Sequence, residues 1–217
     1  MEIHVKTGDA IAEILKREGV EILISYPVNH VIEAAARADI RTVIVRQERI
    51  GLHMADAMSR LSSGKNLGVF AMQHGPGSEN AFGGVAQAYG DSVPILVLPM
   101  GYERAAAHVT PNFNSALNFR NVTKLAEPIT SADEISNVMR RAFTQLRNGR
   151  PAPVLVEIPY DLFTEEITGE LSYKPAFSAR SGPDPDAVSE VAEVLVNADR
   201  LVIYAGQGVH YAEAWQA

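Results

Sequence analysis

The stretch Thr42-Val43-Ile44-Val45-Arg46-Gln47-Glu48 contains the change of pattern that decides the fold class. Its first four residues are all β-branched, which is typical of a buried strand, and a helical pattern follows over residues 48–61. Further strands are predicted at residues 21–26, 67–72, 94–98 and 153–158, and further helices at residues 7–19, 30–38, 78–89 and 132–146. Uninterrupted apolar strands that alternate with helices predict an α/β fold, a doubly wound parallel sheet with helices on both faces.

The same patterns divide the chain into parts. Residues 1–165 are predicted to form one domain, in which residues 101–130 are irregular. Residues 166–184 have the Gly, Pro and polar composition of a linker. Residues 185–217 show a helical pattern and then an apolar strand at residues 201–205, which indicates the truncated start of a second α/β domain. That part is too short to bury a core of its own, so we expect the chain to be a fragment of a longer polypeptide.

Composition excludes several classes of protein. Hydrophobic residues make up 47% and charged residues 21% of the 217 residues, which is typical of a globular protein. The net charge of −7 argues against binding to nucleic acid or to an anionic membrane surface. Cysteine is absent, which excludes thiolate chemistry. No signal peptide or membrane span is visible, so we expect a cytoplasmic protein.

Residues at the ends of the predicted strands are the candidates for function. Glu48 follows one strand and opens a helix, where a carboxylate can serve a ligand, complement the helix dipole, or pair with Arg46 or Arg49. The turn Gly75-Pro76-Gly77 permits close backbone approach but fits neither the Rossmann nor the P-loop pattern. His30 and His74 also follow strands and can line a pocket. The six histidines show no paired metal spacing, so no metal site is predicted.

An ordered set of motifs resembles the N-terminal pyrimidine-binding domain of thiamine diphosphate enzymes of the acetolactate synthase and pyruvate oxidase type. The set comprises Tyr26-Pro27, Arg46-Gln47-Glu48, Gly75-Pro76-Gly77-Ser78-Glu79-Asn80, Asp91-Ser92-Val93-Pro94-Ile95 and the stretch from Gly149 to Pro159. These motifs span roughly residues 1–165 in the order and spacing of the family. The resemblance therefore implies the fold predicted above and thiamine diphosphate as cofactor.

The resemblance also implies roles for individual residues. Glu48 falls on the family's catalytic glutamate, whose carboxyl group shares a proton with N1′ of the cofactor's aminopyrimidine. The other cofactor-binding positions are Pro27, Gly75, Pro76 and Asn80. The loops that face the reacting carbons in the family correspond to Val28, Asn29, His30, Gln73 and His74. Acetolactate synthases resemble Tyr-Pro-Gly-Gly and Thr-Ser-Gly-Pro-Gly at these loops, so the larger side chains here suggest a different substrate or acceptor.

The remaining expectations concern the rest of the enzyme. Members of the family bind the cofactor's diphosphate and Mg²⁺ through a Gly-Asp-Gly motif in a C-terminal domain, and this sequence contains no such motif. The resemblance therefore implies an inactive isolated fragment, and a homodimer or homotetramer that decarboxylates a 2-keto acid or ligates the product to a second carbonyl. FAD is possible in the full-length protein. The alternatives are a non-catalytic binding or assembly module with the same fold and one subunit of a split two-chain decarboxylase.

An apolar subunit interface is expected beside the site. Exposed apolar patches mark such contacts, and the predicted interface residues lie on the helices at residues 48–61 and 78–89. They are Met54, Met58, Ala81, Phe82, Val85 and Ala86. The alternative is that these side chains fill the core of the domain.

Overall fold

A computed structural model describes residues 5–179 and 181–216 of the chain. The described residues fall into two compact units, the first ending at Ser178 and the second beginning at Ala179. The first unit therefore extends beyond residue 165, where the sequence places the end of the first domain. The assignment of functional domains along the chain stays a prediction.

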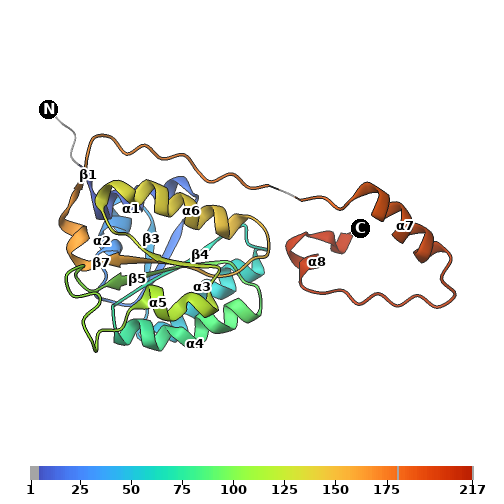
Figure 1. Cartoon of the computed structure of the whole chain (residues 1–217), viewed down its shortest axis with the longest axis horizontal. Coiled ribbons are helices and arrows are strands. Elements are labelled where there is room, and N and C mark those ends of the chain that lie inside the picture. The colour runs from blue at the N-terminus through green and yellow to red at the C-terminus, as the bar shows by residue number, and fades with distance from the viewer. Residues whose placement is uncertain (1–4, 180, 217) are drawn as a thin grey trace. The chain divides into compact units, whose positions relative to one another are not determined.

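The first unit is built on a six-stranded parallel sheet (Figure 1). The strand order is β3-β2-β4-β5-β7-β6, and every neighbouring pair is parallel. The strands are β2 Ile22–Ser25, β3 Arg41–Ile44, β4 Gly68–Met72, β5 Ile95–Gly101, β6 Leu125–Pro128 and β7 Val154–Pro159. In the register, Leu23 of β2 lies opposite Thr42 of β3 and Val69 of β4. This arrangement confirms the predicted parallel α/β sheet.

Helices cover both faces of the sheet, because apolar side chains point to alternate faces along each strand. Leu155 of β7 faces one core cluster, while Val154 and Val156 face the other. The helices α1 Thr7–Arg17, α2 Val31–Arg37 and α6 Ile135–Arg147 pack on the second of these faces. The other face carries α3 Glu48–Leu61, α4 Pro76–Gly90, the short α5 Ser115–Asn118 and the 3₁₀ turn η1 Phe119–Val122, as Figure 1 shows. The further 3₁₀ turns are η2 Ala132–Glu134 and η3 Tyr160–Thr164.

Three short strands depart from the sequence prediction. β6 lies within residues 101–130, for which the sequence predicts irregular structure. Its four residues are only half-buried or exposed, and accordingly its sequence contains no apolar run that would indicate a strand. β1 Val5–Lys6 and β8 Glu166–Ile167 form an antiparallel pair, and two-residue strands leave no periodic signal. β8 also lies within the segment predicted as a linker.

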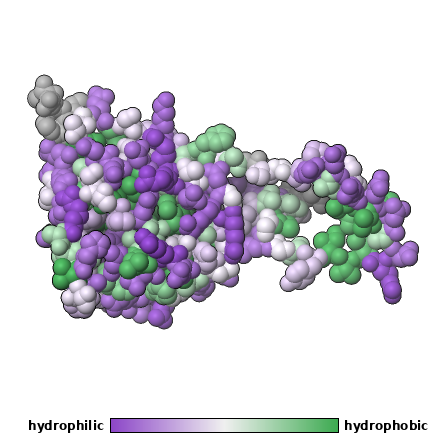
Figure 2. All heavy atoms as spheres, in the orientation of Figure 1, coloured by the Kyte–Doolittle hydropathy of each residue, from purple (hydrophilic) through white to green (hydrophobic). Residues whose placement is uncertain are grey.

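The second unit contains α7 Pro185–Val196, α8 Gly208–Tyr211 and η4 Ala214–Gln216. The helix α7 matches the helical pattern in the sequence, and Asp184 caps it by accepting a hydrogen bond from the Asp186 N–H. The strand predicted at residues 201–205 does not form, because a strand needs a ladder partner and the described part of this unit contains none. Its apolar side chains are exposed, and Figure 2 shows apolar atoms gathered in this unit.

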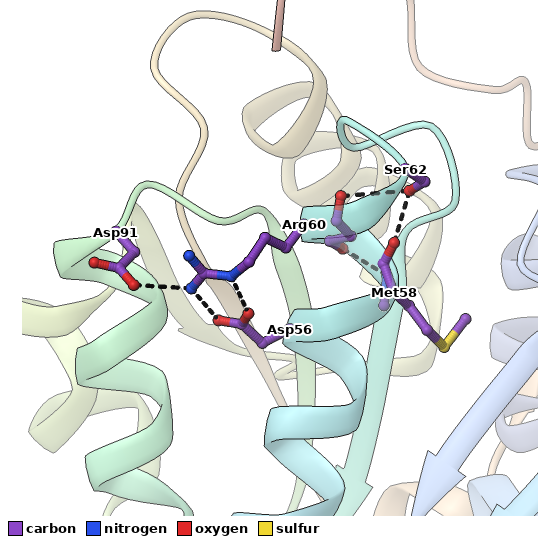
Figure 3. A network of polar contacts seen from close by, with 7 residues as sticks. Asp56, Met58, Arg60, Ser62 and Asp91 are labelled. Carbon is purple, nitrogen blue, oxygen red and sulfur yellow. Dashed lines mark hydrogen bonds and ion pairs between the residues drawn. The ribbon is translucent and has the colours of Figure 1, made fainter. Parts of the chain in front are cut away.

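Close packing and a polar network hold α3 beside α4. A Cβ atom added to Gly84 of α4 would lie 2.5 Å from Leu52 Cδ2 of α3, so any larger residue would force the Leu52 side chain to move. At the other end of the helices, the Arg60 guanidinium donates to Asp56 on α3 and to Asp91 just beyond α4 (Figure 3). These contacts fix the relative position of two helices whose N-termini carry predicted site residues.

Among the described residues, every helix is too short or too polar to span a lipid bilayer.

Candidate active site

The predicted site residues follow β2, β3 and β4, whose carboxyl ends lie at one edge of the sheet. β2 pairs with β3 on one side and with β4 on the other, so the direction in which the chain adds strands reverses there. In open α/β sheets, ligands bind at the carboxyl ends of strands beside such a switch point. The topology therefore brings the three predicted loops to the place where a ligand site is expected.

Glu48 is a buried carboxyl group at the first position of α3, with an exposed fraction of 5%. Its Oε2 accepts a hydrogen bond of 3.2 Å from Asn80 Nδ2 on α4. No donor to Oε1 is found among the residues that the structure describes. This oxygen faces the backbone of Gly77, where an added Cβ atom would lie 3.3 Å away. The protein thus holds the carboxyl group of Glu48 through one of its two oxygens.

The alternative that Glu48 belongs to an ion pair is not realised. Arg46 and Arg49 are both exposed, and within the described chain neither forms an ion pair with Glu48. The position of Glu48 in the first turn of α3 does complement the helix dipole. Burial of a carboxyl group without a cationic partner costs free energy of folding. That cost favours a further role for Glu48 besides its interaction with the helix dipole.

The turn before α4 requires its glycines. Gly75 has a φ of +56°, and an added Cβ atom would lie 2.7 Å from the hydroxyl oxygen of Tyr102. Gly77 is confined between Glu48 and Gln73, whose Cβ would lie 3.1 Å from an added methyl group. Pro76 stands at the first position of α4 and is exposed. The turn therefore packs closely against Tyr102, Gln73 and Glu48, and neither glycine leaves room for an ordinary side chain.

Asn29 has a structural role that the sequence did not reveal. It is buried, and its Nδ2 donates to the carbonyl oxygens of Met72 (2.8 Å) and Leu98 (3.1 Å). Its Oδ1 accepts a hydrogen bond from the Val31 N–H at the start of α2. Asn29 thus ties the end of β4 and the middle of β5 to the loop after β2. The protein itself already engages the amide group of Asn29. A role of Asn29 toward a substrate stays a prediction.

Val28 adopts a backbone conformation that is unfavourable for a β-branched residue. Its φ is +69° and its exposed fraction is 62%. The next residue, Asn29, is fixed by hydrogen bonds, and strain of this kind clusters at binding sites. Pro27 and His30 are exposed on either side. The His30 ring also contacts Tyr160 and Phe163 of η3, with centroid distances of 5.2 Å and 5.3 Å.

Gln73 and His74 lie between β4 and the glycine turn and are half-buried. The His74 ring packs edge-on against Tyr102 at 4.6 Å, and its buried Nδ1 atom finds no hydrogen-bond partner within residues 5–179 and 181–216. Burial lowers the pKa of His74, which favours the neutral imidazole at pH 7. The Gln73 carbonyl oxygen accepts a 3.4 Å hydrogen bond from the Ser78 hydroxyl.

Sequence reasoning missed two residues near this site. Tyr102 lies over Gly75 and His74, but it follows β5 in a stretch without a recognisable pattern. Glu157 is a buried carboxyl group within the otherwise apolar β7. A single charged residue inside an apolar strand is a signal that could have singled out Glu157. In the described parts of the chain, no group of three His, Asp or Glu side chains is arranged to hold a metal ion.

Comparison with known proteins decides the family. The model of the thiamine pyrophosphate enzyme N-terminal TPP binding domain matches residues 5–124, which is more than half of the chain. The chain belongs to the thiamine pyrophosphate enzyme family. This result confirms the resemblance identified from the motifs, and the matched residues include every predicted site residue of this thiamine pyrophosphate enzyme domain.

Several relatives of this thiamine pyrophosphate enzyme domain are similar to it over most of the chain. A probable acetolactate synthase large subunit of Methanocaldococcus jannaschii is 29% identical over 94% of this chain and 36% of its own length. The glyoxylate carboligase of Escherichia coli O157:H7 is 30% identical over 97% of this chain and 36% of its own length. Acetolactate synthase 3, chloroplastic, of Brassica napus is 31% identical over 94% and 32% respectively. The chain thus spans about a third of the length of these relatives.

The predicted interface residues are only partly on the surface. Ala81 and Val85 are fully buried in the core, so their assignment to an interface is wrong; α4 turns these small side chains toward the sheet. Met54 and Phe82 are exposed, although the Phe82 ring packs against Phe119 at 5.0 Å. Beside Met54 lies an apolar groove of about 700 Å³. Its lining includes Ile22, Ile24, Val43, Met54, Met58 and Leu61.

Proposed function

We propose that this chain is the pyrimidine-binding part of a thiamine diphosphate-dependent enzyme and that Glu48 is its catalytic carboxyl group. The observation that carries the proposal is the state of Glu48, which is buried, lacks an ion pair among the described residues, and is held through one oxygen by Asn80. This arrangement leaves the second oxygen available to a nitrogen base. The family membership supports the nature of the ligand.

The residues fit an aminopyrimidine ring. The backbone of Gly77 lies directly beside Glu48 Oε1, and the buried Nδ1 of His74 has no hydrogen-bond partner among the described residues. Carboxyl, amide and backbone groups are the donors and acceptors that a flat, nitrogen-rich ring requires. Pro27, Gly75, Pro76 and Asn80 would hold the ring with Glu48.

The chemistry assigned to the protein is proton transfer. When bound, thiamine diphosphate supplies an electron sink for the decarboxylation of a 2-keto acid. Glu48 holds or accepts the proton at N1′ of the pyrimidine, and Asn80 fixes the orientation of the carboxyl group. Neutral His74 can donate or accept one hydrogen bond without adding charge. Burial of Glu48 excludes water, which would otherwise compete for the same proton.

The substrate we propose is a 2-keto acid, decarboxylated with or without ligation to a second carbonyl. The relatives named acetolactate synthase and glyoxylate carboligase support this class. Val28, Asn29, His30, Gln73 and His74 are the candidates for the substrate pocket. In the whole protein we expect Mg²⁺ and the cofactor's diphosphate to be bound by other parts, a homodimer or homotetramer, and a cytoplasmic location.

The test uses the whole protein of which this chain forms part. Thiamine diphosphate binding is measured by calorimetric titration in the presence of Mg²⁺, and release of CO₂ from pyruvate and from glyoxylate is measured in the same preparation. We expect cofactor binding together with turnover of one of these acids. Cofactor binding without turnover of either acid would favour the non-catalytic module, and absence of binding would contradict the proposal.

A further inference from the structure

The buried carboxyl group of Glu157 has no role in the chemistry described above. Its exposed fraction is 5%, and its side chain points to the same face of β7 as Leu155, toward an apolar cluster. It forms no ion pair within the described structure. Burial raises the pKa of Glu157, while the contacts of Ala116 and Ser115 and the charge of His108 act in the opposite direction. A carboxyl group in such a place lowers stability unless its hydrogen bonds offset the cost.

Those hydrogen bonds lead directly to the site. Glu157 Oε2 accepts a 3.1 Å hydrogen bond from the Ala116 N–H at the start of α5. The hydroxyl of the preceding residue, Ser115, donates to the Ser78 hydroxyl at 2.9 Å. Ser78 in turn donates to the Gln73 carbonyl oxygen at 3.4 Å. Both serines are buried, so no water replaces these contacts at low cost.

The two ends of this chain of contacts are tightly confined. At one end, a Cβ atom added to Gly101 of β5 would lie 3.0 Å from both Cγ and Oε1 of Glu157, so the carboxyl group has little freedom. At the other end, Ser78 follows Gly77, whose backbone lies against Glu48 Oε1. Movement of the first turn of α4 therefore changes the surroundings of Glu48.

We infer that Glu157 is a positioning residue for Glu48: it fixes α5 through Ala116 and, through the contact between the Ser115 and Ser78 hydroxyls, holds the first turn of α4 against the Glu48 carboxyl group. Only the catalytic role of Glu48 in this inference rests on the proposed function. A purely structural Glu157 would stabilise β7 and α5 without any effect on Glu48.

The experiment uses the 217-residue chain without cofactor, so its outcome is independent of thiamine diphosphate binding. Carboxyl signals are observed by ¹³C NMR and the Glu48 signal is assigned with Glu48→Gln. Hydrogen exchange is measured at the Glu79 N–H, which donates to the Gly75 carbonyl oxygen at 3.0 Å. The variants are Glu157→Leu, Glu157→Gln, Ser115→Ala and Ser78→Ala. The matched control is Thr123→Val, which removes a buried 2.8 Å hydroxyl contact to the Phe119 carbonyl oxygen just beyond α5.

We expect Glu157→Leu, Ser115→Ala and Ser78→Ala each to shift the Glu48 signal and to accelerate exchange at Glu79 by about tenfold, the effect of one lost hydrogen bond. Glu157→Gln should stay close to the wild-type protein, because its amide oxygen still accepts from Ala116. Thr123→Val should lower stability without moving the Glu48 signal. If Glu157→Leu does not fold, the two serine variants decide. An unchanged Glu48 signal in a folded Glu157→Leu or in the serine variants, or an equal shift in Thr123→Val, would overturn the inference.

Discussion

At the scale of single residues, the candidate site depends on backbone positions that exclude ordinary side chains. Gly77 is the clearest case, since its missing side chain leaves the space beside Glu48 Oε1. Val28 is the opposite case, because a bulky side chain occupies a conformation that glycine adopts more easily. At Gly77 the backbone determines the surroundings of the Glu48 carboxyl group. At Val28 it determines the shape of the predicted substrate loop.

Replacement of Gly77 should disturb the site more than the fold. We expect Gly77→Ala to displace the Glu48 carboxyl group and to weaken thiamine diphosphate binding to the whole protein by about tenfold, while overpacking costs about 1–2 kcal/mol of stability. The control is Gly83→Ala, also in α4, where an added methyl group meets no atom within 4 Å. That variant should gain up to about 1 kcal/mol from helix propensity and bind normally. Normal binding by a folded Gly77→Ala would contradict the assigned place of the ring.

The strain at Val28 predicts a stability gain from its removal. Val28→Gly should raise the free energy of unfolding by about 0.5–1 kcal/mol, because relief of the positive φ outweighs the added flexibility of the unfolded chain. Chemical denaturation of the 217-residue chain measures the change. Val109→Gly is the control, since Val109 is also exposed but has no positive φ, and we expect it to lose stability. A loss at Val28 equal to the loss at Val109 would show that the strain has no energetic weight.

At the scale of elements, the segment after β8 is an integral part of the first unit. Tyr173 and Ala176 are buried, and both bind the buried Glu18 carboxyl group at the end of α1: Tyr173 donates through its hydroxyl and Ala176 through its N–H at 2.7 Å. Arg147 of α6 contacts Glu18 Oε2 at 2.6 Å as an ion pair. Burial of the ring and the neighbouring Glu18 carboxyl group raise the pKa of Tyr173, and Arg140 and Arg147 oppose the rise.

The Tyr173 contact predicts a dependence of stability on pH. Because the folded state holds the phenolic proton more tightly, this contribution is complete below the ordinary pKa near 10 and is lost as the pH rises further. Tyr173→Phe should cost about 1–2 kcal/mol at pH 7, since it leaves Glu18 with one hydrogen bond fewer. The difference in unfolding free energy between the two proteins should shrink between pH 9 and about pH 11. A constant difference over this range would contradict the role of the hydroxyl group.

The elements also show what the sequence could and could not predict. The runs at β4, β5 and β7 are apolar because both faces are buried, so they were found without any knowledge of their neighbours. β6 and β8 were not found, since their short strands depend on the partner strand rather than on their own composition. The segment 201–205 shows the converse, an apolar run that forms no strand because no partner strand lies beside it in the described part of its unit.

The candidate site, like the fold, was predictable from the sequence only in part. Strand ends and the ordered motifs located Glu48 and Asn80, and the structure brings their side chains into contact. The engagement of the Asn29 amide, the packing of Tyr102 over Gly75 and the contacts of Glu157 were not predictable. Each of these depends on residues that are distant in sequence, and local patterns carry no information about such pairs.

At the scale of the whole molecule, the apolar groove beside α3 is the candidate contact between subunits. Leu61 and Met54 line it and are exposed, and Ile22, Ile24 and Val43 of the sheet also belong to its lining. Uncovered apolar surface of this kind is typical of interaction sites. We therefore expect the groove to be covered in the homo-oligomer that we propose for the whole protein.

A charge placed in the groove should weaken that assembly. We expect Met54→Asp to shift the whole protein toward smaller species in sedimentation equilibrium, with at least about a tenfold weaker association, because a buried unpaired carboxylate is costly. His53→Asp is a control, since it introduces the same charge on α3 at a residue that does not line the groove. An unchanged assembly in Met54→Asp would place the subunit contact elsewhere without affecting the proposed chemistry.

The exchange of the C2 proton of thiamine diphosphate bound to the whole protein tests the central assignment of Glu48 most directly. The rate of hydrogen–deuterium exchange is measured by acid quench and NMR for the wild-type protein, for Glu48→Gln and for Glu79→Gln, which removes an exposed carboxylate from the first turn of α4. Glutamine keeps the shape and a hydrogen bond but cannot share an acidic proton, so we predict exchange slower by about 10²–10⁴-fold in Glu48→Gln and near-normal exchange in Glu79→Gln. Exchange at the wild-type rate in a folded, cofactor-bound Glu48→Gln would contradict the account.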